Sequence, residues 1–438
     1  MGSEMTTEPA SQLDAADPLA RFRSRFVAVD DPSVVAYLDG NSLGRPLAVT
    51  GERLAGFVAG AWGRGLIRSW DEAWMAEPLT VGDRLAEVAL GAAAGQVIVA
   101  DSTTVLLYKL IRAGLGARPG RDEVLIDRGN FPTDRFVVDG IAAECGLSVR
   151  YLSPPRAAGV RPADVAAAIG ERTALVLLSH VAYRSGFIAD MAAITRLAHD
   201  AGALILWDLC HSAGVLPVEL DACDADLAAG CTYKYLNGGP GSPAFGYVAT
   251  RLQEELRQPV LGWMGASDPF AMASEYQPAK GMRKFISGTP PVLAMQPLKD
   301  MIELIAEAGL AAVRRKSVAL TEHAIALSDE MLAPLGAVLA SPREAAERGS
   351  HVTVDHPRFA EVTAALWERG VIPDFRPPDG IRIGLSPLST SFAELDRGVE
   401  AIARELRGRL SAALSTKAAL VIILEVNVVP DAGTHLAR

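Results

Sequence analysis

The sequence predicts an α/β protein whose larger part is a mostly parallel sheet with helices on both faces. From about Asp122 to Thr250, short apolar segments alternate with amphipathic segments in which apolar residues recur every three or four positions. After Pro290-Pro291 the pattern changes to a long helical region, followed by a shorter mixture of strands and helices. We therefore expect a large α/β domain and a smaller α+β domain.

The expected elements follow in chain order. The strands of the large sheet are predicted at residues 124–126, 147–149, 174–178 and 203–207, each flanked by Gly, Asp or Pro. Helices are predicted between them at residues 135–144 and 191–201. The later part is predicted to contain a helical region at 293–332 with a break near Gly309, strands at 351–354 and 381–383, and helices at 359–369 and 392–414.

This order divides the chain into three parts. Residues 1–70 are expected to pack with the small domain, residues 71–290 to form the large ligand-binding domain, and residues 291–438 to form the small domain. Residues 1–18 are polar and acidic and lack the apolar core of a signal peptide, so we expect a frayed tail there. A strand-like run in residues 421–438 has no place in this scheme.

Composition limits the ligand classes. The chain has 438 residues, half of them hydrophobic, and a formal net charge of -10, which argues against nucleic acid and anionic membranes as partners. The apolar run at residues 418–424 is far too short to span a bilayer. The four cysteines form no CxxC pair, so we expect reduced, buried thiols in a cytoplasmic protein without a metal site. Small metabolites are the expected ligands.

An acid and a lysine carry the first chemical signal. Asp208 directly follows the apolar run 203–207, which places a carboxylate at the ligand-binding edge of a parallel sheet. A buried carboxylate there needs a cationic partner, and a protonated pyridine nitrogen is one. Lys234 lies in a segment of small and apolar residues before a Gly-rich turn, where an amine can form an imine with an aldehyde cofactor. Taken singly, such an Asp is often a helix cap and such a Lys a solvated surface residue.

Two further segments could complete a site for a phosphorylated aromatic cofactor. Asp101-Ser102-Thr103-Thr104 opens a predicted helix, where hydroxyls and free backbone N–H groups bind phosphate, although an ordinary N-cap has the same pattern. Asn130-Phe131-Pro132-Thr133-Asp134 follows the strand at 124–126, where Phe131 can stack on a ring and Asp134 can bond to a ring substituent.

These motifs carry a family resemblance over residues 38–392. Their order resembles that of the kynureninases, through Gly40-Asn41-Ser42-Leu43-Gly44, Phe131-Pro132-Thr133-Asp134, Asp208-Leu209-Cys210-His211, Tyr233-Lys234-Tyr235-Leu236-Asn237-Gly238-Gly239-Pro240-Gly241, Gly262-Trp263, Thr289-Pro290-Pro291 and Arg348-Gly349-Ser350. The resemblance implies a fold-type I enzyme dependent on pyridoxal 5'-phosphate (PLP) that hydrolyses L-kynurenine or 3-hydroxy-L-kynurenine, yielding L-alanine and anthranilate or 3-hydroxyanthranilate. It also implies a homodimer.

The resemblance assigns roles to individual residues. Lys234, Tyr233 and Asp208 would be catalytic: Lys234 forms the imine and moves the α-proton, Asp208 holds the pyridine nitrogen, and Tyr233 shuttles protons or steadies an oxyanion. Cofactor contacts are implied for Thr103, Thr104, Phe131, Asp134, Ser179, Asp208, His211, Tyr233, Lys234, Trp263 and Thr289, with Trp263 and Thr289 reaching across a dimer interface. Substrate contacts are implied for Arg382, Ser42 and Trp70, with Arg382 gripping the α-carboxylate.

One departure from the family pattern affects substrate choice. The family usually has Gly-Trp-x-Gly-His where this chain has Gly262-Trp263-Met264-Gly265-Ala266, so an imidazole near the expected site is replaced by a methyl group. A modified kynurenine is therefore an open hypothesis for the substrate. Two more hypotheses stay open, namely a desulfurase-like lyase or aminotransferase of the same fold, and a catalytically silent relative that only binds ligand. A desulfurase needs a mobile catalytic cysteine, and a silent relative would lack Lys234 or Asp208.

Overall fold

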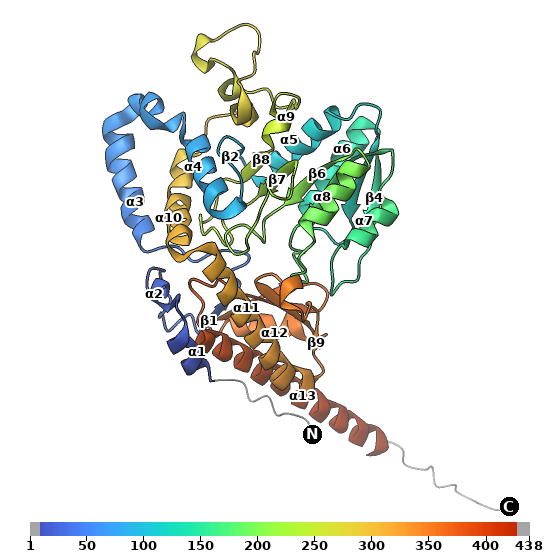
Figure 1. Cartoon of the computed structure of the whole chain (residues 1–438). Helices are drawn as coiled ribbons and strands as arrows, with labels where there is room; N and C mark the ends of the chain where they lie inside the picture. The colour runs from blue at the N-terminus through green and yellow to red at the C-terminus, as the bar shows by residue number, and fades with distance from the viewer. Residues whose placement is uncertain (1–8, 427–438) are drawn as a thin grey trace, which may run out of the picture.

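The large sheet has seven strands and lies in the upper half of Figure 1. The computed structural model describes residues 9–426, with the side chains of residues 9–413. The strand order is β2-β8-β7-β6-β5-β3-β4, with bounds Val97–Val99 (β2), Phe245–Val248 (β8), Leu227–Gly230 (β7), Leu204–Asp208 (β6), Thr173–Ser179 (β5), Glu123–Asp127 (β3) and Ser148–Leu152 (β4). All neighbouring strands run parallel except at β8, which is antiparallel to both β7 and β2. The prediction of a mostly parallel sheet is confirmed.

The central strands are apolar along their whole length because both faces of the sheet are covered. In β6, Leu204 and Leu206 pack into one apolar cluster, and Ile205 and Trp207 into another on the opposite face. One face is covered by α5 (Thr103–Gly116) and α6 (Pro132–Cys145). The other is covered by α4 (Glu77–Leu85), α7 (Pro162–Ala168), α8 (Met191–Asp200) and α10 (Val292–Ala308).

A second sheet of five strands forms the centre of the lower half. Its order is β1-β11-β12-β10-β9, with bounds Ala36–Leu38 (β1), Val371–Arg376 (β11), Gly380–Gly384 (β12), His351–Asp355 (β10) and Val338–Leu339 (β9). Its core is shared with α1 (Ala10–Ala16), α11 (Leu310–Leu327), α12 (Phe359–Trp367) and α13 (Phe392–Val426). The predicted break at Gly309 separates α10 from α11.

The N-terminal residues join both halves of the molecule. β1 pairs in parallel with β11 of the small sheet, whereas α3 (Val49–Phe57) packs against α10. The short helices α2 (Ala20–Arg23) and α9 (Thr250–Gln253) complete the set of α-helices in the described residues. Short helical segments η1 (Val58–Gly65), η2 (Leu66–Arg68) and η3 (Trp70–Trp74) continue α3 into an arm at the left of Figure 1.

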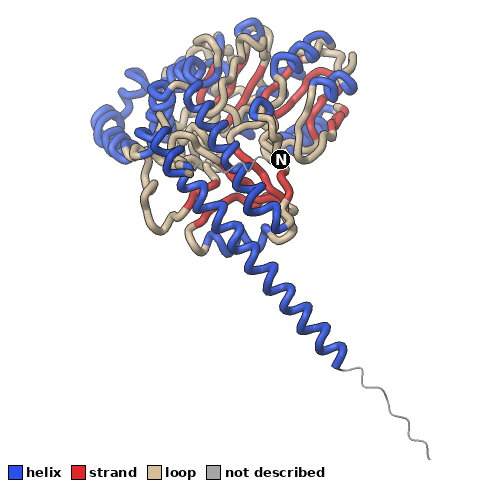
Figure 2. Tube along the Cα trace, turned by 60° about the horizontal axis from the view of Figure 1, so that its bottom comes forward, coloured by secondary structure: helices blue, strands red, loops and turns tan. Residues whose placement is uncertain are grey.

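Three expectations from the sequence are wrong. The N-terminal tail is ordered in part, because Asp14 in α1 accepts hydrogen bonds from the backbone N–H groups of Phe392 and Ala393 and so caps α13. The expected helix 392–414 continues to Val426 and projects from the body in Figure 2, so residues 421–426 are helical rather than strand-like; residues 427–438 lie outside the described part. Cys145 is exposed at the end of α6 instead of buried.

Two absences hold for the described residues. No helix among residues 9–426 combines the length and apolar character needed to cross a membrane. Within the same residues, His, Cys, Asp and Glu side chains nowhere gather in a group of three or more that could hold a metal ion.

Candidate active site

The ends of the central strands bring the candidate residues to one edge of the large sheet. Ser179 ends β5, Asp208 ends β6 at the same register level, and Lys234 follows β7. Phe131 and Asp134 follow β3, with Asp134 in the first turn of α6. This is the edge at which open parallel sheets bind their ligands.

A chain of hydrogen bonds links three of these strand ends. The Ser179 hydroxyl lies 3.1 Å from Oδ2 of Asp208 and 2.7 Å from Oδ1 of Asn130. The backbone N–H of Cys210 donates to Oδ1 of Asp208 over 2.8 Å. Both oxygens of Asp208 are therefore held in place, although the residue is buried. The carboxylate is fixed before any ligand arrives.

Asp134 adds a second buried carboxyl group beside Asp208. Burial raises the pKa of Asp134 well above its ordinary value, and the negative charge of Asp208 raises it further. Oδ2 of Asp134 and Nδ2 of Asn130 are buried without a hydrogen-bond partner. Two acidic groups and two unpaired polar atoms in one buried place indicate a site for a polar, cationic ligand.

Lys234, His211 and Arg382 form a line of basic groups across the site. Nε2 of His211 lies 3.3 Å from Nζ of Lys234 and 3.5 Å from Nη1 of Arg382. Burial lowers the pKa of His211 well below its ordinary value, and the positive charges of Lys234 and Arg382 lower it further. His211 is therefore a neutral acceptor between two cations. Nζ of Lys234 also lies 5.6 Å from the centre of the Phe131 ring.

Arg382 is fixed by contacts from several segments. It comes from β12 of the small sheet, its Nη1 donates to the backbone oxygen of Tyr183 over 2.7 Å, and its Nη2 donates to the Ser42 hydroxyl over 2.7 Å. Asp374, opposite Arg382 on β11, lies 2.7 Å from Nη2. Asp39 lies 4.0 Å away, and burial raises its pKa to about 6. The guanidinium thus lies between the two sheets. The carboxylate of Asp374 contacts it in the way that the carboxylate of a substrate would.

The backbone at Tyr233 and Lys234 packs so closely against Gly44 that a side chain at this glycine would not fit. The backbone N–H of Gly44 donates to the carbonyl oxygen of Tyr233 over 2.9 Å, and a Cβ at Gly44 would lie 2.4 Å from the carbonyl oxygen of Lys234. Burial raises the pKa of the Tyr233 hydroxyl, so this group stays protonated and can donate a hydrogen bond.

Five predicted site residues make no hydrogen bond, ion pair or ring contact with this cluster in the described part of the single chain. Thr103 and Thr104 open α5, half-buried and exposed respectively. Trp263, in η5 (Trp263–Gly265), is 43% exposed and packs on Phe270 in the yellow segment at the top of Figure 1. Thr289 and Trp70 line a separate cavity of about 1130 Å³.

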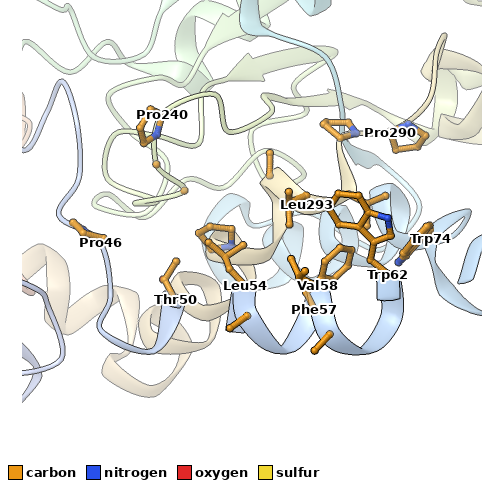
Figure 3. Close-up of a pocket in the computed structure, with 18 of the residues that line it drawn as sticks. Pro46, Thr50, Leu54, Phe57, Val58, Trp62, Trp74, Pro240, Pro290 and Leu293 are labelled. Atoms are coloured by element: carbon orange, nitrogen blue, oxygen red, sulfur yellow. The ribbon is translucent and has the colours of Figure 1, made fainter. Parts of the chain in front are cut away.

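That cavity lies between the N-terminal arm and the start of α10. Figure 3 shows aromatic and aliphatic side chains from both segments pointing into it, including Phe57, Trp62, Trp74 and Leu293. The turn at residues 237–240, shortly after Lys234, closes one side. Trp70 packs edge-on against Trp74 with ring centres 5.1 Å apart. The cavity therefore has aromatic walls and lies next to the segment that carries Lys234.

Comparison with known proteins decides the family. A family model described as the kynureninase C-terminal domain matches residues 313–402. The kynureninase of Burkholderia pseudomallei strain 1106a is 41% identical over 404 residues, covering 91% of this chain and 94% of the relative. The kynureninase of Pseudomonas fluorescens is 42% identical over 391 residues, covering 87% and 91%. The chain belongs to the kynureninase family.

The fold of this kynureninase family member is that of fold-type I PLP enzymes. A cysteine desulfurase from Thermococcus onnurineus superimposes with a TM-score of 0.76 at 19% identity, covering 89% of this chain and 98% of the other. A C-DES mutant with glycine covalently linked to its PLP cofactor superimposes with a TM-score of 0.76 at 18% identity, covering 87% and 98%. A model of the DegT/DnrJ/EryC1/StrS aminotransferase family matches residues 87–221. At such identities the structures establish the fold alone.

The chemistry of the cluster fits PLP. The buried acids Asp208 and Asp134 suit a protonated ring nitrogen and a ring hydroxyl, and the unpaired atoms of Asp134 and Asn130 supply acceptor and donor capacity for such groups. Lys234 is buried beside them and faces the ring of Phe131. The residues present therefore match what a pyridine aldehyde needs from a protein.

Sequence reasoning missed three residues of the site. Asn130 bridges Ser179 to the start of α6, and Tyr183 packs edge-on against Phe131 with ring centres 5.4 Å apart. His351 is fully buried next to His211, and both of its ring nitrogens lack a hydrogen-bond partner. Asn130 begins the candidate segment 130–134, to which only Phe131 and Asp134 contributed assigned roles, and His351 directly follows Arg348-Gly349-Ser350, so both positions were a usable signal.

Proposed function

We propose that this protein hydrolyses the Cβ–Cγ bond of L-kynurenine, of 3-hydroxy-L-kynurenine, or of both. The products are L-alanine and anthranilate or 3-hydroxyanthranilate, and the cofactor is PLP. The observation that supports this most directly is the line formed by Lys234, His211 and Arg382 beside the Asp208 and Asp134 pair. Arg382, at one end of this line, suits an amino-acid carboxylate, and Lys234, at the other end, suits an aldehyde cofactor.

The proposal assigns the cofactor contacts to residues of the cluster. Lys234 would hold the aldehyde carbon covalently, Asp208 the ring nitrogen and Asp134 the ring hydroxyl, while Phe131 stacks on the ring beside His211 and Ser179. Thr103, Thr104 and Tyr233 would bind the phosphate, since helix α5 offers its free N–H groups at Thr103 and Thr104. Trp263 and Thr289 would add contacts from a partner subunit.

Each catalytic side chain has a defined task in this proposal. When bound, PLP serves as the electron sink for the bonds broken at the substrate. Lys234 takes the proton from the substrate α-carbon and later returns it, and Asp208 keeps a proton on the ring nitrogen. Arg382 and Ser42 bind the α-carboxylate. Tyr233, held in its protonated form, donates to the oxygen at the carbonyl that water attacks.

We further propose how the rest of the chain serves this site. Residues 71–290 hold the cofactor, residues 291–438 supply Arg382, and residues 1–70 pack with the latter part. The pairing of β1 with β11 and the ion pair between Lys316 and Asp17, at 2.6 Å, support that packing. The exposed Trp263 and Thr289 support a homodimer in which each subunit completes the other's site. We place the enzyme in the cytoplasm because its cysteines include no disulfide pair among the described residues.

The competing functions have weaker support. Desulfurase activity needs a cysteine on a mobile loop over the cofactor, whereas Cys210 and Cys231 belong to well-packed strand ends and Cys145 ends a helix on the surface. A silent ligand-binding relative has no reason to keep both Lys234 and Asp208 in reach of one buried pocket. A modified kynurenine remains the second candidate, because Ala266 leaves a methyl group where the family has an imidazole.

The test is a turnover assay with both substrates. PLP-loaded protein is incubated with L-kynurenine and, separately, with 3-hydroxy-L-kynurenine; the aryl product is followed by fluorescence and alanine by chromatography. We expect stoichiometric alanine and aryl product from at least one substrate, and none from the Lys234→Ala variant. Protein that binds PLP but releases neither product would overturn the proposal and direct the search to modified kynurenines.

A further inference from the structure

Two cysteines lie side by side at the edge of the large sheet, directly behind the proposed cofactor residues. Asp208 of β6 pairs with Ala229 of β7, so Cys210 and Cys231 follow the two strands at equivalent positions. The backbone N–H of Cys231 donates to Sγ of Cys210 over 3.2 Å, and Sγ of Cys231 lies 3.9 Å from the carbonyl oxygen of Cys210. Each thiol also shifts the pKa of the other. The pair is thus within reach of a disulfide bond after a small shift.

The surroundings of the pair favour one thiolate and one thiol. Burial opposes ionisation of Cys231, but the hydrogen bond from Cys210 and the charge of Lys234 outweigh it and lower the pKa of Cys231 to about 7. The hydrogen bond to Cys231, together with burial, raises the pKa of Cys210. A thiolate next to a protonated thiol is the arrangement that dithiol redox centres use.

Access to the pair limits which oxidant can react. Cys231 is 3% exposed and Cys210 is half-buried, so only a reagent of about the size of water reaches the attacking sulfur. Hydrogen peroxide meets this condition. The other two cysteines, Cys145 and Cys223, lie outside the cofactor cluster, at the end of α6 and in the connection between β6 and β7.

We propose that Cys210 and Cys231 are the site of a reversible disulfide, formed by hydrogen peroxide, that switches off the cofactor site. The Cys231 thiolate attacks one peroxide oxygen, breaks the O–O bond and becomes a sulfenic acid, and the released hydroxide takes up a proton to give water. The Cys210 thiol then attacks the sulfenic sulfur, forms the S–S bond and expels a second water. In total, two thiols and one peroxide give one disulfide and two waters.

The disulfide changes the site because its two ends adjoin catalytic residues. A covalent S–S bond is about 2 Å long, well below the contact distance of two thiols, so Cys210 and Cys231 must approach each other and shift the adjoining residues Asp208 and Lys234. Misplacement of a reacting group by about 1 Å can reduce turnover about 100-fold. The bond also removes the Cys231 thiol, which helps to raise the pKa of the Tyr233 hydroxyl. Both effects reduce activity without removing any catalytic residue.

In the experiment, reduced holoenzyme is treated with limited hydrogen peroxide. Disulfide formation and enzyme activity are then measured separately. Peptide mapping without reductant should find one cross-linked peptide pair containing Cys210 and Cys231, lighter than the separate peptides by two hydrogen atoms. Activity should fall at least about tenfold and return with dithiothreitol. Because peptide mapping needs no turnover, the thiol result stands even if the proposed substrates are not the right ones.

Variants of three of the four cysteines provide the controls. Cys231→Ser lacks the attacking sulfur and should keep its own untreated activity after peroxide, whereas Cys145→Ser and Cys223→Ser should lose activity as the unchanged protein does. If Cys231→Ser does not fold, the peptide map and the recovery with dithiothreitol decide alone. Absence of the cross-linked peptide overturns the disulfide, and a cross-linked enzyme with full activity overturns the switch.

Discussion

Nε2 of His211 lies 3.3 Å from Nζ of Lys234. Since burial and the neighbouring cations lower the pKa of His211, the ring is neutral and its nitrogen accepts a hydrogen bond from the lysine. Arg382 approaches the same nitrogen to 3.5 Å, so His211 separates two positive groups that would otherwise repel each other. The imidazole therefore positions Lys234.

Replacement of His211 tests this positioning role. His211→Phe keeps a ring but removes the acceptor, and a lost hydrogen bond to a charged group corresponds to a decrease in kcat of about 10- to 100-fold. Steady-state kinetics across the pH range are the measurement. The control is His199→Phe, because His199 lies on α8 and pairs with Asp226 rather than with a residue of the cluster. Unchanged kcat and an unchanged pH profile in His211→Phe would show that the contact does not position the lysine.

Lys234 itself gives the sharpest prediction. Lys234→Ala should lose the visible absorption band of lysine-bound PLP and reduce kcat by about 1,000-fold or more, because the variant lacks the group proposed to move the α-proton. Lys234→Arg keeps the charge but cannot form the covalent link, so it should behave like Lys234→Ala. Lys280→Ala, at an exposed position, is the matched control. A retained band in Lys234→Ala would reassign the cofactor lysine.

Arg382 should affect substrate binding more than turnover. In Arg382→Lys the guanidinium that contacts Ser42, Tyr183 and Asp374 is replaced by a single ammonium, which cannot form a two-pronged contact with a carboxylate. We expect KM to rise about 10- to 100-fold with a smaller change in kcat. Arg161→Lys, in an exposed ion pair with Glu347, is the control. A change confined to kcat would place Arg382 in the chemical step instead.

Arg382 shows which parts of the site could be predicted from the sequence alone and which could not. Its own role was implied by the family resemblance, but its partner Asp374 could not be foreseen, because the antiparallel register that sets Asp374 opposite Arg382 depends on how two strands pair. The strand end at Asp208 was readable, since an apolar run followed by a polar residue marks the ligand edge of a parallel sheet.

Other features were not readable for equally physical reasons. β2 has only three residues, and β8 inserts antiparallel between β2 and β7, so neither gives a periodic signal long enough to recognise. The ordered conformation of the residues around Asp14 depends on a tertiary contact. Asp14 caps α13, which begins nearly the whole chain length away. The long extension of α13 lacked a stop signal before Val426.

A buried histidine predicts how stability depends on pH. His180 packs edge-on against Trp207 with ring centres 6.2 Å apart, and burial lowers its pKa from 6.5 to about 4. Between these values the unfolded chain binds a proton that the folded protein does not, so acidification favours unfolding. The free energy of unfolding should fall by about 3 kcal/mol from this group as the pH drops from 6.5 to 4.

The matched variant is His180→Phe, which keeps the aromatic contact with Trp207 but cannot take up a proton. Urea unfolding at a series of pH values from neutral to acid should show a weaker loss of stability in the variant than in the unchanged protein. Equal pH dependence of the two proteins would mean that His180 is protonated to the same extent in the folded and unfolded states.

The proposed sharing of the site between two subunits predicts complementation between two defective subunits. Lys234→Ala lacks the cofactor lysine but keeps Trp263, and Trp263→Ala keeps the lysine but lacks the indole proposed to reach the partner's cofactor. If Trp263 acts across a dimer, a mixed dimer contains one intact site, so random mixing should restore about a quarter of the full activity at limiting PLP. If Trp263 acts within its own chain, mixing restores none of it. The exposed position of Trp263 in the single chain favours the first result, because an indole 43% exposed gains most from contact with a second subunit.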